Sequence, residues 1–197
     1  HQPSNSLTYQ IGNLPILAKY INQKVVCDFR VQDVKLGGQG APLVPVGEEY
    51  LFPKYNTLIN LGGFANITRI NKDNLIAYDI CPINIVFNYL SRKMEYEYDD
   101  RGYIASTGNI NDDLYSHLQR LNYYKQKPPK SLGVEWVNSQ IHTILKNFQD
   151  TPIKDLMNTF SNHFAFQIAK NIGEQDQVLI TGGGAYNDYL INRIKKL

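Results

Sequence analysis

The alternation of apolar and polar residues predicts a group of strands followed by a helix in the middle of the chain. Strands are expected at 57–61, 64–70 and 75–80. The Gly62-Gly63 turn separates the first two strands, and a four-residue polar turn at 71–74 separates the next two. Apolar residues at helical spacing then predict a helix over 83–95. Three antiparallel strands followed by a helix are typical of the opening of a ribonuclease-H-like domain.

The rest of the chain predicts further helices and one more strand. Asn109 or Asn111 is expected to cap a helix over 110–121. The pair Thr151-Pro152 supplies a preferred cap and first residue for a long amphipathic helix that reaches 172. The remaining elements are expected at 134–148 (helix), 177–181 (strand) and 189–197 (helix).

Residues 1–52 are expected to form a separate region, joined to residues 53–197 by a polar connection over 47–54. The pattern predicts a strand at 6–11, a helix at 16–22 and a strand at 24–28. This is too few strands for a closed domain, and the second region lacks the final strand and helix of a ribonuclease-H-like fold. The pattern therefore predicts an α/β protein of two lobes, with the chain cut at both ends.

A polar stretch follows the strand predicted at 24–28. It contains Asp28, Arg30 and Asp33, and then the glycine-rich run Gly37-Gly38-Gln39-Gly40. Glycines let a backbone approach a ligand closely, and carboxylates beside exposed amides at a strand end are what an α/β active site needs. The alternative is a polar surface loop with incidental charges.

Composition excludes several classes of protein. A hydrophobic content of 43% and a charged content of 19% describe an ordinary globular chain. The net charge of +2 comes without a basic block, so no nucleic-acid partner is expected. Two distant cysteines indicate neither a disulfide framework nor a zinc site. Since no apolar run approaches a membrane span and no leader opens the chain, a soluble cytoplasmic protein without a membrane partner is expected.

Three glycine turns suggest a phosphate-binding role when taken together: Gly37-Gly38-Gln39-Gly40, Gly62-Gly63 and Gly182-Gly183-Gly184. The second lies between strands, where backbone amides can form a small anion nest. The third is expected to follow a strand and precede a helix. Neither a P-loop nor the dinucleotide-binding spacing is present. A nucleotide held by two hairpin-like loops across a cleft is the architecture that remains.

These residues resemble the anhydro-N-acetylmuramic acid kinase family of the sugar kinase, Hsp70 and actin superfamily. The resemblance rests on Asp28-Phe29-Arg30, Asp33-Val34 and the run from Gly37 to Pro45. It continues through the segments Asn60–Thr68, Pro128–Ser131 with Gly133 and Glu135, and Gly182–Ala185 with Asn187. The motifs occur in family order and span nearly the whole chain.

The resemblance implies an enzyme that uses ATP and water to convert 1,6-anhydro-N-acetylmuramic acid into N-acetylmuramic acid 6-phosphate and ADP, in peptidoglycan recycling. ATP and Mg²⁺ are the implied cofactors. The metal ligands are not assigned, and a homodimer is one possible oligomeric state. Asp33 matches the catalytic aspartate. Substrate contacts are expected from Asp28, Arg30, Gly38, Gln39 and Gly40. Nucleotide contacts are expected from Gly62, Gly63, Asn66, Asn84, Gly182, Gly183 and Gly184.

Several residues keep a second interpretation. Asp28 could instead bind Arg30 or cap a turn, and Arg30 could instead hold the loop. Glu135 fits a helix's first turn better than a catalytic acid. The histidines His117, His142 and His163 are expected on helices as surface or packing residues, and Cys81 is expected to be structural.

The chain departs from the family in two ways. Cys81-Pro82-Ile83-Asn84 stands where many members have glycine-proline-glycine-asparagine, which puts close backbone approach to a ligand there in doubt. The first phosphate loop and the last strand and helix are also expected to lie outside this chain. Two rival hypotheses therefore remain: a catalytically inactive binding or structural piece, or another sugar kinase of the superfamily.

Overall fold

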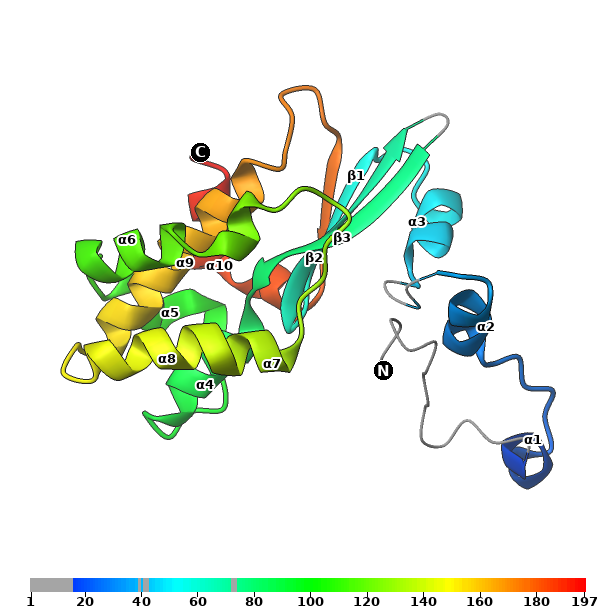
Figure 1. Ribbon diagram of the computed structural model, residues 1–197, viewed down its shortest axis with the longest axis horizontal. Coiled ribbons are helices and arrows are strands. Elements are labelled where there is room, and N and C mark those ends of the chain that lie inside the picture. Colours follow the sequence, from blue (N-terminus) through cyan, green and yellow to red (C-terminus); the bar gives the residue numbers. More distant parts are fainter. Residues whose placement is uncertain (1–15, 39, 41–42, 72–73) are drawn as a thin grey trace. The chain divides into compact units, whose positions relative to one another are not determined.

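The structure is a computed structural model that describes residues 16–38, 40, 43–71 and 74–197. The chain divides into two compact units, residues 1–51 and 52–197 (Figure 1). The strand predicted at 6–11 and the centre of the turn predicted at 71–74 lie outside the described residues. Within the described ranges, every helix is too short or too polar to cross a membrane.

The second unit is built on a four-stranded sheet in the order β3-β2-β1-β4. Strands β1 (Thr57–Leu61), β2 (Phe64–Asn71) and β3 (Asn74–Pro82) pair antiparallel in sequence order. Strand β4 (Val178–Thr181) pairs parallel to β1. All four strands lie within a residue or two of their predicted positions. With the helix that follows β3, this arrangement confirms the α/β, ribonuclease-H-like fold class.

Helices of the second unit gather on one side of this sheet (Figure 1). Their bounds are α4 (Asn84–Arg92), α5 (Tyr103–Ser106), α6 (Asp112–Gln119), α7 (Val134–Trp136), α8 (His142–Leu145), α9 (Ile153–Ala169) and α10 (Asp188–Ile194). The apolar stripe of α9 is core, as predicted, with Phe160, Phe164 and Ile168 fully buried. Sheet residues in the same cluster are Ile59, Leu61, Ile67 and Ile80. Burial of each such side chain stabilises the fold by about 1.5–3 kcal/mol.

Two helix predictions were wrong in detail. The helix expected at 134–148 is interrupted by a π-helical segment, Val137–Ile141. Val137 and Ile141, four residues apart on the same face of this segment, are both buried in the core. Thr151 does not cap α9, because extended Pro152 (φ −53°, ψ 136°) occupies the cap position without a side-chain bond. Asn111 does cap α6, accepting the Leu114 N–H at 2.9 Å.

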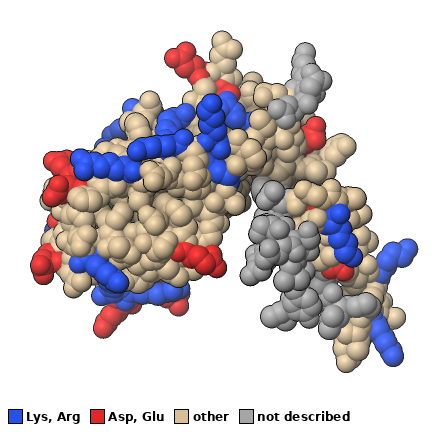
Figure 2. Space-filling model, in the orientation of Figure 1, with Lys and Arg blue, Asp and Glu red and all other residues tan. Residues whose placement is uncertain are grey.

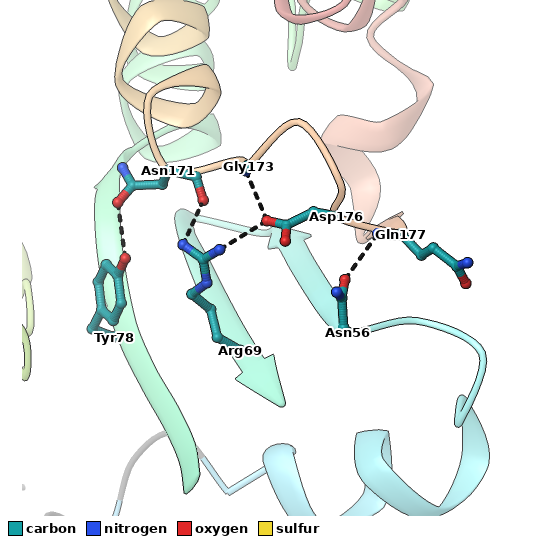
Figure 3. A network of polar contacts seen from close by, with 7 residues as sticks. All are labelled: Asn56, Arg69, Tyr78, Asn171, Gly173, Asp176 and Gln177. Carbon is teal, nitrogen blue, oxygen red and sulfur yellow. Dashed lines mark hydrogen bonds and ion pairs between the residues drawn. The ribbon is translucent and has the colours of Figure 1, made fainter. Parts of the chain in front are cut away.

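A polar network ties the α9–β4 connection to the end of the sheet away from the glycine turns (Figure 3). Arg69 on β2 donates from Nη2 to Asp176 Oδ2 at 2.9 Å and from Nη1 to the Asn171 carbonyl at 3.3 Å. Asp176 also accepts the Gly173 N–H at 2.8 Å. Asn56 Oδ1 accepts the Gln177 N–H at 2.8 Å, immediately before β4. The network therefore fixes where β4 begins beside β1.

Arg69→Met is expected to lower the free energy of unfolding by about 1–2 kcal/mol, because Asp176 and the Asn171 carbonyl lose charge-assisted partners. Urea unfolding followed by circular dichroism measures the change. Arg101→Met is the matched control, since its ion pair with Asp188 is exposed, with side-chain exposures of 68% and 58%. A loss of stability as large in the control as in Arg69→Met would contradict a special role for the network.

His163 on α9 is a buried packing residue, as predicted, with Tyr124 and Tyr115 edge-on to its ring. Neither ring nitrogen has a hydrogen-bond partner among the described residues. Burial, and to a smaller extent the positive charge of Lys170, lowers the His163 pKa to about 3. The folded protein therefore holds this ring neutral at pH values where the unfolded chain would protonate it.

Acid is accordingly expected to destabilise the fold through His163. The unfolded ring gains a proton below its ordinary pKa of about 6.5, while the folded ring gains one only near pH 3, so this stability is lost as the pH falls between those values. The free energy of unfolding should fall by about 3 kcal/mol less in His163→Phe than in the wild type when the pH is lowered from 7 to 4. Urea midpoints of both proteins at the two pH values measure this, and an equal loss in both would refute the role of His163.

The described part of the first unit is helical: α1 (Ile16–Ile21), α2 (Phe29–Lys35) and α3 (Pro45–Leu51). The strand predicted at 24–28 was wrong. That segment has no strand structure, and Val26 is 73% exposed, because no described strand of this unit is there to pair with it. The polar connection predicted at 47–54 was also wrong over its first half, which belongs to α3.

Candidate functional site

Three strands of the second unit end at one edge of the sheet. β2 runs antiparallel to both β1 and β3, and β4 runs parallel to β1, so the carboxyl ends of β1, β3 and β4 coincide. The Gly62-Gly63 turn follows β1, the start of α4 follows β3, and Gly182–Gly184 follow β4. The carboxyl edge of a sheet is where α/β folds bind ligands. The structure therefore brings the predicted nucleotide-binding segments together.

The carbonyl groups of the β1–β2 turn are held by the first residues of α4. Leu61 O accepts Asn84 Nδ2 at 3.1 Å, and Gly62 O accepts the Asn84 N–H at 3.3 Å. Gly63 O accepts the N–H groups of Ile83 at 2.9 Å and Ile85 at 3.3 Å. Three successive carbonyls thus point at the amino end of α4.

This arrangement sets the direction of the turn's amides. In a planar trans peptide, the C=O and the following N–H point in opposite directions. The Gly62 and Gly63 N–H groups therefore point away from α4, and neither takes part in a hydrogen bond recorded between described residues. Two adjacent N–H groups directed outward at the sheet edge are suited to an anion.

The Gly182–Gly184 loop packs directly on the end of β1. A Cβ at Gly182 would lie 2.9 Å from the Leu61 carbonyl carbon and oxygen, and one at Gly184 would lie 2.7 Å from Leu61 Cβ. Gly182 also has φ +83° and ψ 172°, a conformation nearly exclusive to glycine. Gly183 differs, because a Cβ there would have Asn84 Nδ2, at 4.0 Å, as its nearest neighbour. Two of the three glycines are thus required for packing.

The loop does not lead straight into a helix, which corrects the expectation of a helix dipole behind it. A 3-10 turn, Gly183–Tyr186, intervenes before α10. The amino end of α10 is already capped, because Asn187 Oδ1 accepts the Leu190 N–H at 2.9 Å. Any anion at this loop would be bound by the loop's own amides.

Asn66 lies across from Asn60 in the β1–β2 register and is half-buried. Asn60 is a residue that the sequence prediction left out of the site. Its Nδ2 lies 3.4 Å from Thr181 Oγ1 on β4, and its Oδ1 would lie 3.1 Å from a Cβ at Gly62. Asn60 stands two residues before one glycine turn and Thr181 directly before the other, which is the signal that could have identified them.

Cys81 and Ile83, the departures from the family pattern, are fully buried in the core. Both belong to the hydrophobic core cluster, so their side chains pack among core residues. Burial raises the pKa of the Cys81 thiol well above its usual value, in agreement with a structural role. The two substitutions do not obstruct the glycine loops.

In the first unit, Asp33 lies on helix α2 and not on a loop, and the glycine run folds back onto it. The Gly40 N–H donates to Asp33 Oδ2 at 2.6 Å, and the Gly38 N–H donates to the Asp33 carbonyl at 2.8 Å. A Cβ at Gly38 would lie 2.2 Å from Asp33 Oδ2, so a side chain at residue 38 would displace the carboxylate from its present position. Gln39 lies outside the described residues.

Arg30 holds the same loop from the other side, donating from Nη1 to the Gly40 carbonyl at 2.6 Å. This contact agrees with the interpretation of Arg30 as a loop-holding residue. Asp28 is the first residue before α2, in a left-handed conformation with φ 67°, and its side chain makes no capping hydrogen bond. Arg30, Asp33, Gly38 and Gly40 therefore form one local cluster, with Asp28 at the start of the helix that carries it.

Other features do not compete with these two clusters. A cavity of about 560 Å³ lies beyond the carboxyl end of α4, lined by Met94, Tyr96, Tyr98 and residues of α5 and the start of α9, and it includes no predicted site residue. Across the described ranges, no three His, Cys, Asp or Glu side chains gather as a metal site. On the visible face of the second unit, Lys and Arg side chains gather along the upper part, and Asp and Glu side chains lie mainly around the outline (Figure 2). Backbone geometry marks the site.

The chain matches a known protein family over its whole length. The family model "Anhydro-N-acetylmuramic acid kinase" matches residues 1–197. An anhydro-N-acetylmuramic acid kinase of Clostridioides difficile is 37% identical over 98% of this chain and 54% of its own length. One of Vibrio parahaemolyticus is 34% identical over 100% of this chain and 56% of its own length.

A solved structure, the activator of the 2-hydroxyisocaproyl-CoA dehydratase from Clostridium difficile with bound ADPNP, is 18% identical over 76% of this chain and 53% of that chain, with a TM-score of 0.47. The chain spans about half the length of the curated relatives that it matches. Because the family model covers every residue, the chain belongs to the anhydro-N-acetylmuramic acid kinase family.

Proposed function

We propose that this chain is part of a cytoplasmic, ATP-dependent kinase that converts 1,6-anhydro-N-acetylmuramic acid into N-acetylmuramic acid 6-phosphate and ADP. The observation that carries the nucleotide part is the pair of outward-directed amides at Gly62 and Gly63, beside the tightly packed Gly182–Gly184 loop. Family membership supports the choice of the amino sugar as the second substrate.

In the proposed reaction, Asp33 takes a proton from water as the water oxygen bonds to the anomeric carbon. The bond between that carbon and O6 breaks, O6 accepts the γ-phosphoryl group, and ADP leaves. The Gly40 N–H at Oδ2 orients the Asp33 carboxylate. The substrate contacts proposed for Asp28, Arg30, Gly38, Gln39 and Gly40 place the sugar beside this carboxylate.

Nucleotide phosphates are assigned to the Gly62-Gly63 turn with Asn66, and adenosine to the Gly182–Gly184 loop. Mg²⁺ would neutralise charge on the phosphates during transfer. It is usually held by one or two carboxylates together with the phosphates themselves. In this proposal residues 1–52 carry the general base, and residues 53–197 carry the nucleotide-binding loops.

The proposal is tested by ADP release from a protein extended to the full length of the curated relatives. Release is expected with anhydro-N-acetylmuramic acid, and not with N-acetylmuramic acid or glucose. No release with the anhydro sugar from a folded full-length protein would refute the proposal, and release with glucose would favour another sugar kinase. ATP titration of the present chain by calorimetry tests the nucleotide part separately.

A binding or structural piece without catalysis is the second candidate for the chain as it stands. The observation that favours it is that the chain spans about half of its relatives. Phosphoryl transfer depends on precise positioning, so an incomplete ATP site would catalyse poorly. ADP release by the present chain would exclude this candidate.

A further inference from the structure

Asn84, the first residue of α4, lies where α4 meets the Gly62-Gly63 turn and the Gly182–Gly184 loop at the carboxyl end of the sheet. Its Nδ2 donates to the Leu61 carbonyl at 3.1 Å, and its backbone N–H donates to the Gly62 carbonyl at 3.3 Å. The same Nδ2 would lie 3.6 Å from a Cβ at Gly184 and 4.0 Å from one at Gly183. One residue on α4 therefore borders both glycine loops.

The hydrogen bonds of Asn84 fix the direction of two amides. Because C=O and the following N–H are opposed across a trans peptide, the bond to Leu61 O turns the Gly62 N–H outward, and the bond to Gly62 O turns the Gly63 N–H outward. Two consecutive glycines have wide backbone freedom and would otherwise sample several peptide orientations.

The Asn84 carboxamide is partly occupied by the protein's own backbone. Its NH₂ group has two N–H donors, and one of them donates to the Leu61 carbonyl. The other end of the carboxamide is an oxygen acceptor, which an anionic phosphate oxygen would repel.

We propose that Asn84 is a positioning residue that acts on the nucleotide through the Gly62 and Gly63 amides, which its hydrogen bonds hold in their anion-binding direction. This inference rests on the proposed ATP-binding function. It replaces the direct contact that the sequence predicted for Asn84.

The test compares Asn84→Ala and Asn84→Asp with the wild-type chain by ¹⁵N relaxation and by ATP titration. Both variants keep the backbone bond to Gly62 and remove the donor to Leu61. In the nucleotide-free protein, the order parameter at Gly62 is expected to fall from about 0.85 towards 0.6, while that at Gly63 stays high because the retained backbone bond still holds its peptide. ATP affinity is expected to weaken about tenfold, since an oriented donor is lost. Asn84→Asp retains the side-chain volume, so it replaces Asn84→Ala in both measurements if the alanine variant folds poorly.

Asn66→Ala is the control, because Asn66 lies at the same edge on β2 and has no recorded hydrogen bond to a glycine loop. It should leave the order parameters at Gly62 and Gly63 unchanged. Weaker ATP binding in the Asn84 variants with unchanged loop order would indicate direct contact and overturn the inference, as would no change in either quantity. Should the wild-type chain not bind ATP, the nucleotide part of the proposed function fails for this chain, while the relaxation data still decide whether Asn84 orders the turn.

Discussion

Asp33→Asn is expected to lower turnover of the full-length kinase by about 10²–10⁴, the usual contribution of a general base. The substitution keeps the side-chain volume, and an amide oxygen can still accept the Gly40 N–H that now bonds to Oδ2 at 2.6 Å. The glycine loop should therefore stay folded on α2. What is lost is the negative charge that would accept the proton from the attacking water.

The measurement is the initial rate of ADP release with anhydro-N-acetylmuramic acid, together with ATP affinity and the unfolding midpoint. Both of the latter should match those of the wild type. Asp28→Asn is the matched control, because it makes the same change on the same segment at a residue placed before α2. Near-normal turnover of Asp33→Asn would remove Asp33 from the role of base, and an equal loss in Asp28→Asn would leave the two carboxylates without distinct roles.

Gly182→Ala and Gly184→Ala are expected to weaken ATP binding by roughly 10-fold to 100-fold, from overpacking of about 1–3 kcal/mol. The added methyl group at either position would overlap the end of β1, at 2.9 Å from the Leu61 carbonyl or 2.7 Å from Leu61 Cβ. Neither a backbone carbonyl nor a Cβ can rotate aside. Gly182→Ala carries the further cost of an alanine at φ +83°, so it should be the more severe of the two.

Gly183→Ala supplies the control for this pair. It lies between the two glycines, yet its new methyl group would meet only Asn84 Nδ2, at an ordinary contact distance of 4.0 Å. ATP titration by calorimetry should give an affinity close to that of the wild type for this variant. A uniform loss across all three positions would mean that the loop tolerates no side chain for reasons other than its packing on Leu61.

The second unit was largely predictable, because its elements are marked locally. Alternating apolar residues define β1 to β3, glycines mark the turns, and the long stripe of α9 has helical spacing. In the first unit the helix predicted at 16–22 was confirmed as α1, but the strand predicted at 24–28 was wrong and helices α2 and α3 were not predicted. The apolar run ending at Cys27 has a strand's composition, but a strand exists only where another strand pairs with it, and the described part of this unit offers none.

The sequence by itself determined the family, the fold class and the glycine turns at strand ends, since these depend on residue type, order and spacing. Only the tertiary structure decided that Asp33 lies on a helix with Gly40 bonded to it, that Cys81 and Ile83 face the core, and that Asn84 borders both loops. The physical reason is that these features are contacts between segments distant in the chain, or choices of facing direction. Pairing, packing and peptide orientation settle such features, and no local pattern encodes them.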